Sequence, residues 1–169
     1  MYLDRLSKHD IKELVVRNWM THDGMWFMHC LQEVGIEKTN RINKAAGRSL
    51  AGIEFKRVMK AFNLGPVTDM ETFKEALEAG WSVLGGDFMD FGFRFEGDNG
   101  FHAEARRCFA IEGMKRLGVA DQYECGVFSR MEGWFETMGI RYSVSPKVTG
   151  CMMVTKGRCY RDYRFEFGD

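Results

Sequence analysis

Three cysteines in the last third of the chain have the residue type and spacing of a metal site. Cys151 and Cys159 lie eight residues apart with Gly157 between them, so we expect them to flank a tight turn. Cys125 lies 26 residues before Cys151, near the start of a predicted helix, where the positive helix end favours a thiolate. Nearby cations are expected to lower the thiol pKa values further: Lys156, Arg158 and Arg161. Convergent thiolates are soft ligands that favour zinc, or secondarily an iron–sulfur cluster. The alternative is three buried core thiols, which is also our interpretation of Cys30 and Cys108.

A second set of polar and aromatic residues lies on the first predicted helix. His22 and His29 share one side of this helix, within an apolar stripe, and Asp23 borders it. The two imidazoles are seven residues apart, a rise of about 10.5 Å, so we do not expect them to share a metal. With Trp19 and Trp26 they are candidates to line a ligand pocket. The alternatives are hydrogen-bonded core histidines or a homodimer interface.

Phenylalanines alternate with polar residues in the middle of the chain. Phe91 and Phe93 fall on one face of a predicted strand, and we expect them to wall a pocket between the helices and the sheet. The predicted ligand is a small apolar or aromatic molecule. In the return strand His102, Glu104 and Arg106 share the opposite face, which reads as a surface row.

The elements that must position these residues follow from periodicity and caps. Helices are predicted from the Ser7–Asp10 capping box to Val34, over 37–62, from the Thr68–Glu71 box to Leu84, over 108–117, and from the Asp121–Glu124 box to Met138. Strands are predicted over 91–95, 101–105, 140–144, 152–154 and 163–167. This order, three helices, a hairpin, two helices and two or three strands, indicates an α+β fold with helices packed on an antiparallel sheet. We expect one domain over 1–169, with a helical part over 1–67 and a second part over 68–169.

Composition excludes several classes of protein. The formal net charge is zero, without the basic excess of a nucleic-acid binder. No apolar run approaches the roughly 18 residues of a membrane helix, and the segment Met1–Asp10 is too polar for a signal peptide. Five cysteines without a secretory start favour reduced thiols in the cytoplasm. Motifs for nucleotide cofactors are missing from the sequence, so we expect none.

The cysteine segment resembles a known family. Cys125, followed by the segment from Cys151 to Cys159 and an aromatic strand ending in Phe165 and Phe167, is similar to 4-vinyl reductase-type domains, which are related in fold to TRAPP subunits and haem-NO-binding domains. The resemblance implies a TRAPP-like fold, a small-molecule-binding role and a structural zinc held by three cysteines and a glutamate. Val148 stands at the position of that glutamate, so Glu124, water or another group would replace it.

The N-terminal part has a second resemblance. The segment from Trp19 to Phe27, with Gly35 and Asn43, is similar to uncharacterised cytosolic proteins related to the L-2-amino-thiazoline-4-carboxylic acid hydrolase family. It implies an alternative function, a metal- or cysteine-dependent hydrolase that cleaves a C–N bond of a small cyclic substrate. Weak catalytic candidates are then His22 with Asp23 as an acid/base pair and Cys125 as the nucleophile. A third alternative is a homodimeric interaction module, since TRAPP-like folds pair through helices.

Overall fold

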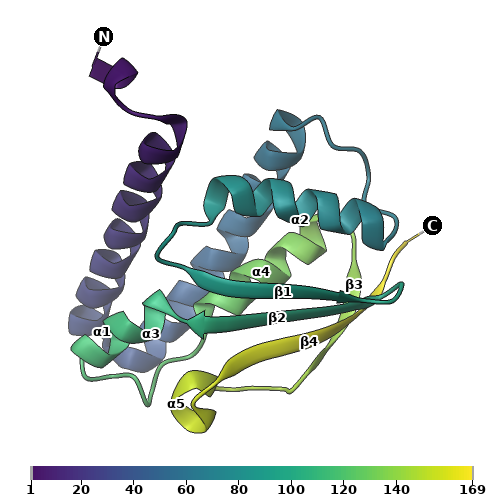
Figure 1. The fold of residues 1–169 in the computed structure, drawn as a ribbon. Helices are drawn as coiled ribbons and strands as arrows, with labels where there is room; N and C mark the ends of the chain where they lie inside the picture. Colours follow the sequence, from purple (N-terminus) through teal and green to yellow (C-terminus); the bar gives the residue numbers. More distant parts are fainter. Residues whose placement is uncertain (1, 169) are drawn as a thin grey trace.

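In a computed structural model, which describes residues 2–168, helices cover one face of a four-stranded antiparallel sheet (Figure 1). The strand order is β1-β2-β4-β3. The elements are a 3-10 helix at Tyr2–Arg5, α1 (Lys8–Ala61), α2 (Met70–Leu84), β1 (Asp90–Glu96), β2 (Gly100–Arg107), α3 (Phe109–Arg116), α4 (Gly126–Thr137), β3 (Arg141–Ser145), α5 (Met152–Lys156) and β4 (Cys159–Glu166). The predicted α+β class is confirmed. The first and last residues of the predicted domain lie outside the described residues.

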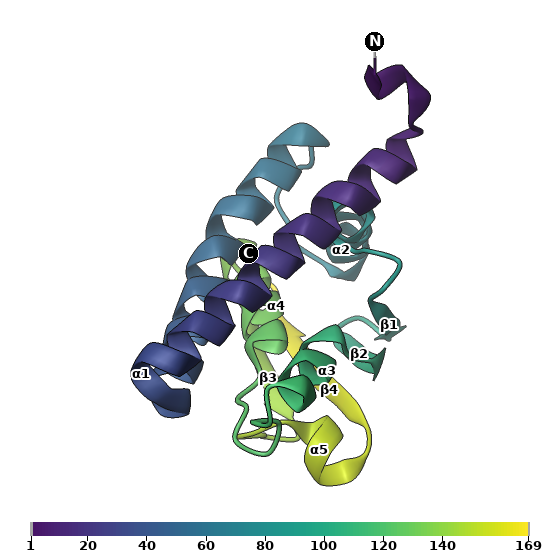
Figure 2. The ribbon, with the colours of Figure 1, turned by 90° about the vertical axis from the view of Figure 1, so that its left-hand side faces the viewer.

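Helix α1 is a hairpin of two arms that meet at Gly35. Gly35 has φ 75° and ψ 170°, a conformation essentially restricted to glycine, and the predicted break between two helices is confirmed. Figure 2 shows the arms diverging from this turn. The predicted cap at Ser7 is also confirmed, because its hydroxyl accepts the Asp10 N–H at 3.1 Å while Asp10 accepts the Ser7 N–H at 3.0 Å.

The second arm of α1 packs closely on α4 through small residues. Ala51 is fully buried, and a Cβ added at Gly133 would lie 2.6 Å from the Ala51 Cβ. Any larger side chain at Gly133 would therefore push the two helices apart. This close approach fixes α4, and with it the loop that precedes α4, relative to α1.

Three predicted boundaries are wrong. Residues 152–154 form the start of helix α5 rather than a strand, because the N–H groups of Val154 and Thr155 bond back to the Cys151 carbonyl while β4 already pairs with β2 and β3. Helix α4 begins at Gly126 rather than near Asp121, since the buried side chain of Asn40 takes the Glu124 N–H at 3.1 Å. Helix α2 is capped by Asp69 and Thr72, one residue later than the predicted Thr68–Glu71 box.

Aromatic rings fill the space between the helices and the inner face of the sheet. The ring of Phe73 on α2 lies 4.7 Å from that of Phe165, 5.1 Å from that of Phe101 and 5.7 Å from that of Phe135, between centroids. These four side chains and Tyr163 are at most 2% exposed. The predicted β1–β2 hairpin is confirmed, with Phe93 opposite Ala103 and Phe91 opposite Ala105.

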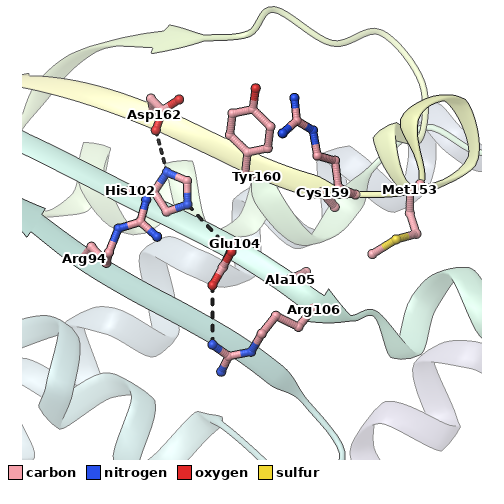
Figure 3. Close-up of a pocket in the computed structure, with 11 residues that line it drawn as sticks. Arg94, His102, Glu104, Ala105, Arg106, Met153, Cys159, Tyr160 and Asp162 are labelled. Carbon is pink, nitrogen blue, oxygen red and sulfur yellow. Dashed lines mark hydrogen bonds and ion pairs between the residues drawn. The ribbon is translucent and has the colours of Figure 1, made fainter.

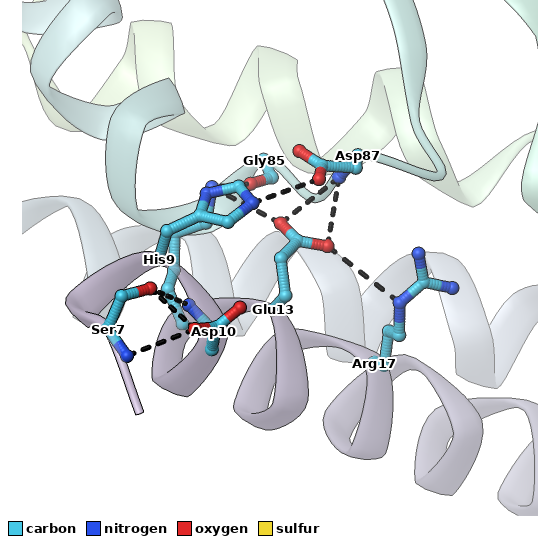
Figure 4. Close-up of polar contacts among 8 residues, drawn as sticks. Ser7, His9, Asp10, Glu13, Arg17, Gly85 and Asp87 are labelled. Carbon is cyan, nitrogen blue, oxygen red and sulfur yellow. Dashed lines mark hydrogen bonds and ion pairs between the residues drawn. The ribbon is translucent and has the colours of Figure 1, made fainter. Parts of the chain in front are cut away.

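A polar contact attaches the first arm of α1 to the loop after α2 (Figure 4). Both carboxylate oxygens of Glu13 accept the Asp87 N–H at 3.1 Å, and Lys12 donates to the Gly85 carbonyl at 2.9 Å. His9 Nε2 lies 3.1 Å from Asp87, and Arg17 lies 3.8 Å from Glu13.

Among residues 2–168, no helix combines the length and apolar character needed to cross a bilayer.

Candidate functional site

Four cysteines, rather than three, converge beside the end of the sheet. Cys108, Cys125 and Cys151 are the N-cap residues of α3, α4 and α5, and Cys159 is the first residue of β4. Burial raises the pKa of Cys159, and the other three thiols raise it further, so Cys159 interacts electrostatically with each of them. Cys108 is buried, as predicted for a core residue, but it belongs to this cluster. Its position at the start of a predicted helix, like that of Cys125 near the start of another, was the signal in the sequence.

The predicted lowering of the thiol pKa values is wrong in its net direction. Burial raises the pKa of Cys125 to about 11 and that of Cys159 to about 12, and it also raises that of Cys108. The positive charge of Arg161 lowers the pKa of Cys125 and Cys159, but desolvation outweighs it. None of the three N-cap thiols forms a side-chain capping hydrogen bond. The amides of Phe128 and Val127 nevertheless act to lower the pKa of Cys125, by less than burial raises it.

Arg161 is a buried cation beside these thiols. It is 5% exposed, donates to its neighbour Tyr160 carbonyl at 2.8 Å and to Met152 Sδ at 3.6 Å, and lies 4.7 Å from the ring centroid of Phe128. Within residues 2–168, no carboxylate oxygen lies within 4.0 Å of its guanidinium. A buried cation is costly without a counter-charge. Arg161 interacts electrostatically with Glu132 and Tyr163. It interacts in the same way with the thiols of Cys125 and Cys159.

The donor set suits zinc, although the sulfurs are not in bonding positions. Four thiols with helix amides and one buried cation form a site for a metal that prefers soft ligands. In the described part of the chain, no three of the sulfurs lie mutually within 4.8 Å. The fold therefore brings the four cysteines to one region of the molecule, but no three of their sulfurs are close enough together to bind one metal ion. Three His, Glu and Asp ligand atoms do lie that close, at His9, Glu13 and Asp87. Lys12 and Arg17 both form ion pairs with Glu13 there.

The other candidates for the fourth ligand position have different partners. Glu124 forms an ion pair with Lys44 on the second arm of α1. Val148 is half-buried against the core. The buried phenol of Tyr123, next to the thiols, accepts the Gly126 N–H at 3.2 Å. The remaining thiol, Cys108, is thus the fourth donor that the fold brings to the cluster.

The predicted ligand residues of the first helix lie on the surface of α1. Trp26 is 62% exposed and its indole donates to His22 Nε2 at 3.1 Å. The His22 and Asp23 side chains approach to 3.9 Å, and burial raises the pKa of Asp23. His29 is exposed, so neither histidine is a core residue.

Trp19 contributes to a buried polar network rather than to this exposed set. Its ring lies 4.3 Å from the guanidinium carbon of Arg130, which pairs with Glu54, while Trp134 donates to Glu54 at 2.7 Å. Glu54 is 5% exposed. The network joins both arms of α1 to α4. A ligand or catalytic role for these helix residues stays a prediction.

Phe91 and Phe93 pack against Trp81, with ring centroids 5.4 and 5.1 Å away. A surface hollow of about 390 Å³ lies between α2 and β1, lined by Trp81, Phe93 and Phe95 among others. Phe91 is not part of its lining. The predicted site between helices and sheet therefore corresponds to packed rings, with this hollow at its edge.

The outer face of the sheet carries a larger hollow, of about 590 Å³, around His102 (Figure 3). The predicted surface row does face this side. His102 itself is only 8% exposed, because Tyr160 stacks on its ring and Asp162 accepts from it. The prediction that His102 is a surface residue is therefore wrong.

Comparisons with known proteins give one match. A model described as a family of unknown function, DUF6125, matches residues 4–83, which cover α1 and most of α2 and fall just short of half the chain. The chain is similar to that family over this region. Neither curated proteins nor solved structures give a match. The cysteine cluster and the His102 hollow lie largely beyond the matched residues.

Proposed function

We propose that this protein is a small-molecule-binding domain whose C-terminal half is stabilised by a structural zinc ion at Cys108, Cys125, Cys151 and Cys159. The observation that carries this proposal is the convergence of these thiols from α3, α4, α5 and β4. Four cysteines are a usual donor set of structural zinc sites. All five cysteines are free, which fits a reducing cytoplasm.

A zinc ion would cross-link elements that are weak by themselves. Helix α5 has five residues and α3 has eight, too few for an isolated helix to be stable. Bound thiolates would also add to the negative charge near the buried Arg161, which already interacts with Glu132. Zinc binds thiolates, and burial raises the pKa of Cys108, Cys125 and Cys159, so zinc binding would release protons and become tighter as pH rises.

Metal analysis of protein purified without added metal tests the proposal. We expect about one zinc per chain, as required by a four-ligand site. Cys108→Ser and Cys151→Ser should lose the metal and melt at lower temperature, while the control Cys30→Ser keeps both properties. Metal-free protein whose melting is unchanged by Cys151→Ser would contradict a zinc site. If Cys108→Ser retained zinc while Cys151→Ser lost it, Cys108 would not be the fourth ligand.

Thiol reactivity separates this proposal from a cysteine-dependent hydrolase. A nucleophilic cysteine needs thiolate at neutral pH, whereas burial raises the pKa of Cys125 to about 11. In metal-free protein, alkylation of Cys125 by iodoacetamide should therefore be slower at pH 7 than that of free cysteine. Rapid alkylation at neutral pH, followed by mass spectrometry, would instead support the hydrolase.

The exposed apolar side chains favour self-association as a second function. Among residues 2–168, thirteen large hydrophobic residues are exposed, and all but Val83 and Val154 lie within 2–62. On the first arm of α1, Leu14 and Met25 are eleven residues apart, as are Val15 and Trp26, so these four share one face. Exposed patches of this kind mark protein interfaces. We propose that a second copy of the chain covers this face.

Analytical ultracentrifugation tests the dimer. Trp26→Glu and Met25→Glu should shift the protein to monomer, because each places a charge in the apolar face. The control Val83→Glu changes an exposed hydrophobic residue on α2 and should leave the dimer intact. A wild-type chain that sediments as a monomer at all concentrations would overturn this second function.

A further inference from the structure

The hollow on the outer face of the sheet is built by three strands and by helix α5 with the turn that follows it. Strands β1, β2 and β4 supply its floor and the turn after α5 supplies one wall (Figure 3). Met153, Gly157 and Arg158 border it on the α5 side, and Tyr160 and Asp162 stand on β4. The other face of the same strands packs against the aromatic core. The hollow is therefore held by a rigid support.

His102 in this hollow has one ring nitrogen without a partner. Its Nδ1 lies 2.6 Å from Asp162 Oδ1, and its ring stacks on Tyr160 with centroids 5.6 Å apart. Its Nε2 is buried and has no hydrogen-bond partner among the described residues; Glu104 Oε2 lies 3.9 Å away, beyond bonding distance. A buried polar atom without a partner costs about 1–3 kcal/mol, so such an atom points to a missing group.

The charges around this nitrogen favour an anion. Arg94 and Arg158 border the hollow, and in the described part of the chain neither forms an ion pair. Arg106 is shared between Asp90 and Glu104. Of the two carboxylates that line the hollow, Glu104 pairs with Arg106 and Asp162 pairs with His102. The guanidinium of Arg158 lies 5.0 Å from the Tyr160 ring centroid. Among the described residues, Arg94 and Arg158 thus offer N–H donors that no carboxylate occupies.

We propose that this hollow binds a small organic carboxylate. One carboxylate oxygen accepts a hydrogen bond from His102 Nε2–H, while Arg94 and Arg158 add charge-assisted hydrogen bonds. The apolar part of the ligand packs against Met153 and the edge of the Tyr160 ring, since His102 and Arg158 lie over that ring. Asp162 keeps its contact with His102 Nδ1 and is thus a positioning residue. The inference rests on the proposed ligand-binding function; Cys159 also borders the hollow, so zinc content is measured together with binding.

Titration with benzoate, followed by NMR of the ¹⁵N-labelled protein, tests this site. We expect saturable shifts of the His102 ring nitrogens and of the Tyr160 amide, with Nε2 moving toward its protonated position. Arg94→Gln combined with Arg158→Gln should weaken binding by about a hundredfold, because the loss of each charge-assisted hydrogen bond costs about tenfold in affinity. The control Arg141→Gln removes a cation of β3 that pairs with Glu166 and does not line the hollow, and should bind benzoate like the wild type.

Three outcomes would overturn the inference. They are a wild-type protein without saturable shifts, an equal loss of affinity in Arg141→Gln, and equal binding of benzamide, which lacks the charge. Amide spectra and zinc content of the same samples show whether each variant is folded and metal-bound. If a folded, zinc-bound protein does not bind benzoate, the carboxylate site is contradicted and the zinc site is not. If the protein binds benzoate but contains no zinc, the zinc site is contradicted and the carboxylate site is not.

Discussion

The α1 hairpin and the segment from α2 to β4 use their apolar residues in opposite ways. The second segment buries its large rings against one another, and Phe73, Phe101 and Phe135 are at most 1% exposed. The first arm of α1 instead leaves Trp26 and Val15 about 60% exposed. The difference lies in the first arm, because the second arm buries Ala51 and Phe55 completely in the same core. The first arm of α1 therefore leaves much of its apolar surface exposed.

Polar contacts add direction to the apolar packing that attaches α1 to the rest of the molecule. Glu54 joins Arg130 and Trp134, and Asn40 binds the loop before α4 through the Gln122 carbonyl and the Glu124 N–H. Glu13 holds the far end of the first arm. Buried polar groups of this kind are directional, so they fix where α1 lies more than they add to stability.

The strongest test of the contrast is the pair Phe73→Ala and Trp26→Ala. Phe73→Ala should lower the free energy of unfolding by about 3–5 kcal/mol, because it opens a cavity among four rings. Trp26→Ala should change it by about 0.5 kcal/mol or less at concentrations where the chain is monomeric. Urea denaturation measures both. A large loss from Trp26→Ala that grows with protein concentration would locate stability in the dimer rather than in the core.

Glu54→Gln tests whether the α1 attachment is energetically important. It removes the carboxylate from the buried guanidinium of Arg130, and we expect a loss of about 3 kcal/mol in the free energy of unfolding. The control Glu33→Gln is exposed on the same helix and should be near neutral. If thermal unfolding of Glu54→Gln matched that of Glu33→Gln, α1 would be held by packing on α4 instead.

Gly35→Ala tests the turn between the two arms. Nothing lies within 4 Å of an added Cβ, so its expected cost of about 1–3 kcal/mol is backbone strain alone. Gly24→Ala is the matched control, since it also meets no neighbour but has a helical backbone. It should stabilise by about 0.5–1 kcal/mol. Circular dichroism melting compares the two; a neutral Gly35→Ala would mean that the turn relaxes freely.

Glu13→Gln should have the smallest effect, about 1 kcal/mol, because the amide oxygen of Gln can still accept the part-buried Asp87 N–H. The loss should be local, with faster amide hydrogen exchange over residues 8–20 and unchanged exchange in α2–β4. Glu37→Gln, exposed on α1, serves as the control. Faster exchange throughout the sheet would show that the two regions unfold together.

Local sequence chemistry determined most of the secondary structure. The Ser7 cap, the break at Gly35 and the alternating phenylalanines of β1 each depend on residues a few positions apart, so they could be predicted. The errors arose where distant groups intervened. Asn40 takes the Glu124 N–H from 84 residues away and delays α4, and the paired edges of β4 leave residues 152–156 to form a helix.

Residue type and spacing by themselves identified Cys125, Cys151 and Cys159 as related, because their chemistry is readable in one dimension. Only the tertiary structure added Cys108 to them, reversed the direction of the thiol pKa shifts through burial, and placed Arg161 beside them. It also made His102 a buried residue, since its cover comes from Tyr160 and Asp162 on a strand some 60 residues away. Desolvation and long-range convergence depend on how the chain folds back on itself, and a linear pattern does not contain them.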